Sequence, residues 1–228
     1  MSIIDESIIQ DFNEYSFWIK ASLRDYEYNE DLVENIGKLK RILQIMCEKY
    51  AGHKVIDKYI VREIVYFPCA ILDCKYNIKD KQQEIENVAS DFRKALSTIL
   101  DGTWDFVNEK EEIDLGEQYQ RILEVEVECW ENSLGECGFV TAYNMSKKFD
   151  FVRCNIFLNM LKELVELSNK IGYYSKNAVR ILCGVYEFYC ELYDELDTLG
   201  EIEGEDELDT LGEINGLYSK FLDIVVIV

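Results

Sequence analysis

Apolar residues recur along most of the chain at intervals of three and four, the spacing that places side chains on one face of an α-helix. Ile8, Phe12 and Ile19 follow this spacing, so a first helix is predicted over about residues 5–26. The same spacing predicts further helices over about residues 30–50, 55–76, 80–100, 114–134, 149–171 and 176–193. These elements predict an all-α fold in which about seven or eight helices form a single bundle, one domain of residues 1–228.

Few residues break these helices, because the chain contains one proline and twelve glycines. The proline, Pro68, falls inside the predicted helix 55–76. We expect it to kink or split that helix, because it lacks an N–H and its ring clashes with the preceding turn. Asn29 offers an N-cap for the second helix. Asp80 and Asp114 are each followed three residues later by Gln or Glu, a variant of the capping box that predicts the starts of the fourth and fifth helices.

The fifth predicted helix has a competing interpretation. Its apolar seam at helical spacing consists of Tyr119, Leu123, Val127, Trp130 and Leu134. Residues 123–129, LEVEVEC, also alternate with a period of two, which is typical of a strand. The longer helical seam favours a helix, and a short strand pair near residues 123–143 stays the alternative.

A tandem repeat of twelve residues occupies positions 194–217. It reads DELDTLGEIEGE and then DELDTLGEINGL. Four glycines interrupt it, and each costs a helix about 1 kcal/mol relative to alanine. The repeat is therefore predicted to form two short helical turns joined by glycine loops on the protein surface. Residues 218–228 are apolar enough that we expect them to dock or to pair with something.

The acidic residues are concentrated in two blocks. The net charge is −21; residues 105–138 contain two basic and eleven acidic side chains, and residues 181–219 contain twelve acidic and no basic ones. A protein with this charge repels nucleic acid and anionic membranes, and it attracts basic proteins at rates that fall with salt. The expected partner is therefore a basic protein, without direct contact to nucleic acid or membrane.

We expect this partner to bind carboxylates of both blocks. On the helix predicted over residues 114–134, four acidic residues share the face opposite the apolar seam. The predicted partner-binding residues belong to this face and to the repeat: Glu117, Glu124, Glu128, Glu131, Asp194, Glu195, Asp197, Glu201, Glu203, Glu205, Asp206, Glu207, Asp209 and Glu213. Two alternatives stay open. The acids form a solvated face that keeps the protein soluble, or some of them pair internally with Lys147, Lys148, Arg153 and Lys162.

Residues with catalytic or metal-binding chemistry are scarce. The single histidine, His53, lies between two predicted helices and has no predicted partner for catalysis or for a di-iron site. Residues 195–206 imitate part of an EF-hand loop, but Glu195 and Leu199 stand at two ligand positions that require other residues, so a calcium site is rejected. The eight cysteines form no C-x-x-C pair and are predicted to be thiols. No catalytic residue, metal site or cofactor is predicted, and the protein is predicted not to be an enzyme.

The N-terminus, MSIIDESIIQDF, carries acids where a signal peptide needs a basic start followed by an apolar run. The apolar run at 224–228 is far shorter than a membrane span. A cytoplasmic location is therefore predicted.

The charge pattern favours an inhibitor or immunity-type protein. Its acidic face would cover a basic surface of a nucleic-acid-handling partner, with carboxylates standing in for phosphates and nearby aromatic residues adding affinity. The aromatic residues expected to be exposed are Tyr173, Tyr174, Tyr193 and Tyr218. A phage-encoded inhibitor of a CRISPR effector fits equally well. A helical scaffolding protein and a helical enzyme that uses buried carboxylates are less favoured hypotheses.

A family resemblance points to the same class. Leu-Arg-Asp at 23–25 precedes Tyr26, two long helices are predicted, and FRKAL stands at 92–96. In this pattern residues 23–101 resemble the N-terminal helical part of PoNi-type immunity proteins. The resemblance implies a helical protein that neutralises a nuclease toxin, and it assigns no functional residue.

Overall fold

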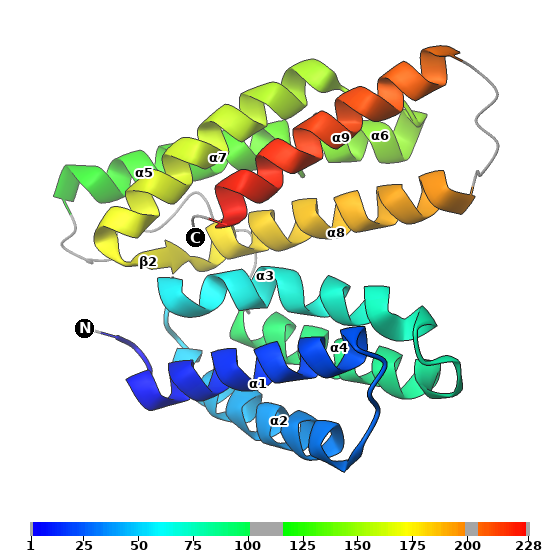
Figure 1. Ribbon diagram of the computed structural model, residues 1–228. Helices are drawn as coiled ribbons and strands as arrows, with labels where there is room; N and C mark the ends of the chain where they lie inside the picture. The colour runs from blue at the N-terminus through cyan, green and yellow to red at the C-terminus, as the bar shows by residue number, and fades with distance from the viewer. Residues whose placement is uncertain (1, 101–115, 199–204, 227–228) are drawn as a thin grey trace. The chain divides into compact units, whose positions relative to one another are not determined.

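The computed structural model describes residues 2–100, 116–198 and 205–226. Within these ranges the chain forms nine α-helices, two short 3-10 segments and one pair of short antiparallel strands (Figure 1). The predicted all-α class is confirmed, with slightly more helices than expected. The predicted cap at Asp114 and residues 199–204 of the repeat lie outside the described residues. No described helix is both long and apolar enough to cross a lipid bilayer.

The chain divides into two compact units. Unit 1 comprises Met1–Thr103 and Tyr173–Val179, and unit 2 comprises Trp104–Gly172 and Arg180–Val228. Unit 1 therefore takes a short segment from the second half of the sequence. That residues 1–228 form one domain stays a prediction.

Unit 1 contains four helices whose apolar stripes pack together: α1 Glu6–Arg24, α2 Glu30–Tyr50, α3 Lys58–Asp73 and α4 Gln82–Ile99. In its core the ring of Phe92 lies 6.1 Å from that of Phe12 and 4.5 Å from that of Phe67, between ring centroids. The start of α2 is confirmed, because the Asn29 side chain accepts a hydrogen bond from the Leu32 N–H at 2.9 Å.

The strand pair does not lie at the expected place. β1 Val55–Asp57 pairs antiparallel with β2 Tyr173–Ser175, so that Ile56 stands opposite Tyr174. Residues 123–143, the predicted location, lie in α5, a turn and α6 instead. The third helix accordingly begins at Lys58 rather than at residue 55. Local periodicity does not show this, because the strand that pairs with Val55 comes about 120 residues later.

Two local signals in unit 1 mispredict the helices. Pro68 lies inside α3, which continues past it, so the helix is not split; a kink at Pro68 stays a prediction. Pro68 and its neighbours Phe67 and Cys69 are all buried, and this packing offsets the hydrogen bond that proline removes. Asp80 does not cap the fourth helix. It lies in the 3-10 segment Lys79–Lys81, and α4 starts after that segment without a side-chain cap.

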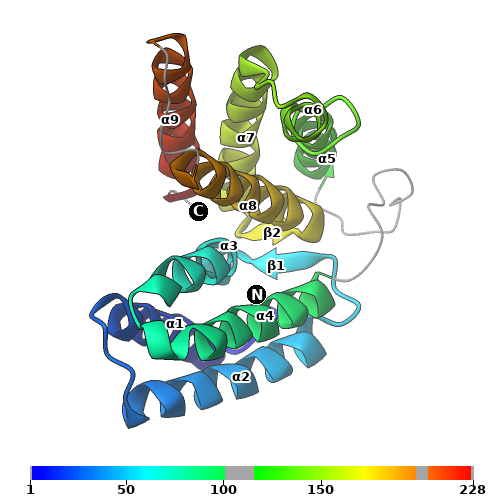
Figure 2. The ribbon, with the colours of Figure 1, turned by 90° about the vertical axis from the view of Figure 1, so that its right-hand side faces the viewer.

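Unit 2 is built from α5 Gly116–Asn132, α6 Phe139–Ser146, α7 Phe151–Ile171, most of α8 Lys176–Thr198, and α9 Glu205–Val226. α7 lies between α5 and α9 (Figure 2). An aromatic core joins these helices. The ring centroid of Phe221 on α9 lies 5.6 Å from that of Tyr189 on α8 and 6.5 Å from that of Phe157 on α7. α6 is a helix that the sequence did not predict, and its first residue, Phe139, packs into the same core.

α5 buries a different row of side chains from the one predicted. Ile122, Val125 and Cys129 are fully buried, and so is Glu126. The members of the predicted seam whose side chains are described are only half-buried: Leu123, Val127, Trp130 and Leu134. α5 carries two adjacent apolar rows, and periodicity alone does not tell which of them faces the core.

The second copy of the repeat, residues 206–217, lies within α9. Gly212 and Gly216 are inside this helix, so the predicted short turns joined by glycine loops are wrong for this copy. The expected docking of the C-terminal residues is confirmed, because Phe221 and Val225 are fully buried. Burial of these side chains offsets the helix stability that is lost at the two glycines.

Replacing Gly212 by Ala is expected to raise the free energy of unfolding by about 1 kcal/mol. A Cβ at this position meets no atom within 4 Å, and alanine favours a helix. Gly172 is the matched control, since it also has open space around it but a φ of +85°. Gly172→Ala should lower the same free energy by about 1 kcal/mol. Urea unfolding followed by circular dichroism measures both, and a change of the same sign in both variants contradicts this account.

Candidate functional site

Nearly all of the excess negative charge belongs to unit 2. Unit 1 contains 15 basic and 18 acidic side chains, and unit 2 contains nine basic and 27 acidic ones. The net charges are therefore −3 and −18. Both acidic blocks identified in the sequence fall in unit 2, which makes its surface the place for the candidate site.

Three exposed carboxylates follow one another along α5, at Glu124, Glu128 and Glu131, and are called here the α5 acidic face. Their spacing of four and three residues puts them on one side of the helix, with Cβ atoms about 5–6 Å apart. Glu128 and Glu131 form no ion pair with any described residue. The side chain of Glu117, the predicted fourth member, lies outside the described residues.

Arg121 neutralises only one end of this face. Its guanidinium forms a two-pronged ion pair with Glu163 of α7, with distances of 2.7 Å from Nε to Oε1 and 3.1 Å from Nη2 to Oε2. Its Nη1 also lies 3.3 Å from Oε2 of Glu124. The hydrogen bond to Glu163, followed by that to Glu124, raises the pKa of Arg121. Arg121 therefore connects α5 to α7, and Glu128 and Glu131 have no basic partner among the described residues.

A groove of about 770 Å³ lies beside the α5 acidic face, between the end of α5 and the start of α7, and is called here the α5–α7 groove. Glu131 and Glu136 contribute carboxylates to its lining. Val152 and Ile156 contribute apolar side chains that are 71% and 43% exposed. Neighbouring exposed apolar residues in a groove with a polar rim are typical of protein-binding surfaces.

The one basic side chain in the lining of the α5–α7 groove is already engaged. Arg153 Nε lies 3.3 Å from Oδ2 of Asp150, and its guanidinium donates to the main-chain oxygen of Cys137. The Asp150 side chain also accepts from the Arg153 N–H at 3.0 Å and so caps α7. Arg153 therefore does not cancel the carboxylates of Glu131 and Glu136.

The second acidic block is partly neutralised within the protein. Lys147 Nζ lies 2.9 and 3.1 Å from the two carboxylate oxygens of Glu195, and the Tyr143 hydroxyl lies 3.2 Å away. The hydrogen bond from Lys147 lowers the pKa of Glu195. The alternative of internal pairing with Lys147 is thus confirmed for this residue. Glu213 is exposed on α9. The other predicted residues of this block have side chains outside the described part of the structure: Asp194, Asp197, Glu201, Glu203, Glu205, Asp206, Glu207 and Asp209.

Glu213 of the second block lies apart from the α5 acidic face. α7 separates α5, which carries the α5 acidic face, from α9, which carries Glu213 (Figure 2). The tyrosines expected near the acids also differ from expectation. Tyr174 is fully buried in unit 1, because its side chain points from β2 into the core, and Tyr173 and Tyr218 are half-buried. The side chain of Tyr193 lies outside the described residues.

Other side chains with reactive groups are spread through the fold. His53 is exposed in the turn after α2, as predicted. All eight cysteines are thiols rather than disulfides, also as predicted. Burial raises the pKa of the Cys154 thiol to about 11, which keeps it protonated, whereas Cys137 is exposed at the α5–α7 groove. Among the described residues, no three or more His, Cys, Asp or Glu side chains gather into a metal-binding group.

Sequence analysis missed the apolar part of the candidate site. Val152 and Ile156 stand four residues apart on α7, away from the buried stripe that contains Cys154 and Phe157. Apolar residues on the polar side of a predicted helix are the signal that identifies them.

Comparison of the chain with protein-family models, with curated proteins and with solved structures found no match. The resemblance of residues 23–101 to PoNi-type immunity proteins stays a prediction. The function is therefore inferred from the α5 acidic face and the α5–α7 groove.

Proposed function

We propose that this protein is a non-catalytic inhibitor that binds and blocks a basic, nucleic-acid-handling protein, such as a nuclease toxin or a nucleic-acid-guided defence effector. The observation that carries this proposal is the α5 acidic face. Its carboxylates at Glu128 and Glu131 are exposed and have no basic partner in the described part of the chain. The exposed apolar side chains of Val152 and Ile156 lie in the groove next to it.

The two parts of the surface have different roles in this mechanism. The carboxylates occupy positions on the partner that bind phosphates of nucleic acid, and their charge speeds the encounter of the two proteins. Val152 and Ile156 lose their exposed surface on docking, and this supplies short-range affinity that salt does not screen. The association rate should therefore depend on salt more strongly than the dissociation rate.

An immunity protein and an anti-defence inhibitor use the same surface chemistry, because both have to cover a site that binds phosphates. The partner distinguishes them: a nuclease toxin supports the immunity role, and a CRISPR-type effector supports the anti-defence role. A surface that only keeps the protein soluble would bind neither.

Replacing Glu124, Glu128 and Glu131 together by Gln is expected to weaken binding to the partner about 10- to 100-fold at 50 mM NaCl, mainly through slower association. The partner is obtained by affinity capture from the native host and then purified. Association and dissociation rates are measured by surface plasmon resonance at 50 and 200 mM NaCl. The variant should fold about as stably as the wild type, because the loss of like-charge repulsion along α5 offsets the loss of the Arg121–Glu124 ion pair.

The matched control replaces three exposed acids of unit 1, Glu6, Asp11 and Glu48, by the corresponding amides, which changes the net charge equally. This control should reduce affinity by less than about threefold. A short oligonucleotide should compete with the wild-type protein for the partner. Equal losses in both triple variants, or a partner that nucleic acid does not displace, contradict the proposal.

A further inference from the structure

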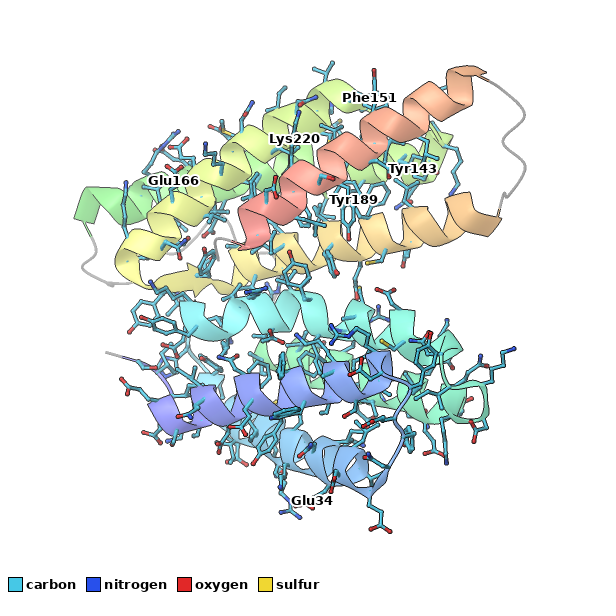
Figure 3. All side chains as sticks on the ribbon, viewed as in Figure 1. Glu34, Tyr143, Phe151, Glu166, Tyr189 and Lys220 are labelled. Atoms are coloured by element: carbon cyan, nitrogen blue, oxygen red, sulfur yellow. The ribbon has the colours of Figure 1, made fainter. Side chains whose placement is uncertain are left out.

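A second groove, of about 470 Å³, lies in unit 1. It runs between the outer sides of α1 and α2 and is called here the α1–α2 groove. α1 contributes Tyr15 and Trp18, and α2 contributes Asp31, Glu34 and Lys38. These residues recur every three or four positions, so each helix presents them along one edge. Glu34 lies on the outer side of α2 (Figure 3).

One end of the α1–α2 groove already holds a cation from the chain itself. The Lys38 Nζ lies 5.4 Å from the ring centroid of Tyr15 and 2.7 Å from Oε1 of Glu34. The hydrogen bond from Glu34 raises the pKa of Lys38, and the same bond lowers the pKa of Glu34. An aromatic face together with a carboxylate is thus a cation-binding arrangement at this end of the groove.

The other end repeats this arrangement without a basic residue. Trp18 stands one helical turn after Tyr15 and is 50% exposed. Glu27 and Asp31 line the same groove, are exposed, and form no ion pair with any described residue. Among the described residues that line the groove, Lys38 is the one basic side chain, and it is engaged at the Tyr15 end. Asp31 lies near enough to help raise the pKa of Lys38, but it forms no ion pair with it.

The Trp18 ring has an aromatic neighbour on its own helix. Phe17 packs against it edge to face, with ring centroids 5.4 Å apart. A large aromatic side chain that is half exposed offers a large contact area for a single residue, as binding anchors do.

We propose that the Trp18 end of the α1–α2 groove binds an arginine side chain from a basic peptide segment of a partner protein. The planar guanidinium lies on the indole face of Trp18 and donates hydrogen bonds to the carboxylates of Asp31 and Glu27. Arginine fits better than lysine, because its flat group stacks on an indole and presents a fork of N–H donors to carboxylates. This site goes beyond the proposed function, since it lies in unit 1 and uses none of the residues of the α5 acidic face.

The test titrates the full-length protein with a tetra-arginine peptide at 50 mM NaCl and follows the NMR signal of the Trp18 indole N–H, which Trp18→Phe assigns. A site-specific signal is needed because a protein with a net charge of −21 attracts this peptide over much of its surface. We expect the Trp18 signal to shift and saturate with tetra-arginine, and to require several-fold more tetralysine.

Variants in the groove locate the site through isothermal titration calorimetry of the same peptide. Trp18→Ala should weaken the binding step about tenfold. Tyr59 is the matched control, because it is also an exposed aromatic residue of unit 1 but lies outside the groove. Tyr59→Ala should change the affinity less than twofold. Asp31→Asn should weaken it about fivefold. Glu30→Gln is the matched charge control, because Glu30 lies in the same first turn of α2 but does not line the groove.

The results separate this proposal from the proposed function. Equal effects of Asp31→Asn and Glu30→Gln, or an unchanged affinity of Trp18→Ala, overturn the arginine site. Saturation of the Trp18 signal by a neutral peptide of the same length, or self-association of the protein through this face, overturns it as well. The triple variant of Glu124, Glu128 and Glu131 should leave the saturation of the Trp18 signal within about twofold of wild type, so each proposal can fail without the other.

Discussion

Replacement of Phe139 by Ala is expected to lower the free energy of unfolding of unit 2 by about 4 kcal/mol. Phe139 is fully buried, and its ring centroid lies 5.6 Å from those of Phe149 and Phe157, 5.8 Å from that of Phe188 and 6.4 Å from that of Tyr189. These rings come from α7, α8 and the segment between α6 and α7, so none of these elements can fill the cavity alone. Urea unfolding followed by circular dichroism measures the loss.

Met145 provides the matched control, because it lies on the same short helix and is 82% exposed. Met145→Ala should change the free energy of unfolding by less than about 0.5 kcal/mol. Phe139→Leu, which keeps most of the volume, should cost about 1–2 kcal/mol and stays measurable if the alanine variant does not fold. Similar losses in the Phe139→Ala and Met145→Ala variants would show that the aromatic core does not depend on Phe139.

Replacement of Asp57 by Ala is expected to lower the free energy of unfolding of unit 1 by about 3 kcal/mol. The Asp57 carboxylate is buried and accepts hydrogen bonds from the Tyr50 hydroxyl at 2.7 Å, the Ser2 hydroxyl at 2.9 Å and the Ile3 N–H at 3.2 Å. Alanine leaves the Tyr50 hydroxyl without this acceptor in the core and releases the N-terminus. Burial, together with the hydrogen bond to Asp57, raises the pKa of Tyr50, so this hydroxyl stays protonated and keeps donating.

Two further variants separate the contributions around Asp57. Tyr50→Phe removes one donor and should cost about 1–2 kcal/mol, whereas Asp57→Asn keeps an acceptor for Tyr50 and should cost less than Asp57→Ala. Asp11→Ala, at an exposed position of α1, should be nearly neutral. Thermal unfolding measures all four. An alanine variant at Asp57 as stable as that at Asp11 would mean that the buried carboxylate contributes nothing to the fold.

The helices that the sequence predicts well are those with one clear apolar stripe, such as α1 and α2. α2 combines the stripe that ends at Tyr50 with the Asn29 cap, and both signals are local. β1 was not predicted, because its stability depends on a strand far away in the sequence, which no local pattern shows. α6 was not predicted for a different reason. It has eight residues, too few for a periodic pattern, and it is held by Phe139 rather than by its own propensity.

The acidic residues of the candidate site could be predicted from the sequence, whereas their ion pairs and the grooves could not. Charge is a property of composition, so the sequence located the acidic residues of α5 directly, and Glu124, Glu128 and Glu131 are exposed on one side of the helix. Whether a carboxylate is compensated depends on neighbours from other helices. Glu163 and Lys147 act from α7 and from the end of α6 respectively, and neither pairing follows from spacing along one helix. The α5–α7 groove and the α1–α2 groove are formed by two helices each, so they appear only after the chain has folded.

The division of unit 1 between two distant stretches of sequence has a consequence during synthesis. β1 lacks its pairing strand, and the Tyr50 carbonyl lacks the Lys176 ammonium that lies 3.2 Å away, until residues 173–179 have been made. At a translation rate of about 5–20 residues per second, residues 104–179 take roughly 4–15 s to appear. During that interval the four N-terminal helices form without the strand that completes unit 1, so we expect unit 1 to reach its final structure only after most of unit 2 has been synthesised.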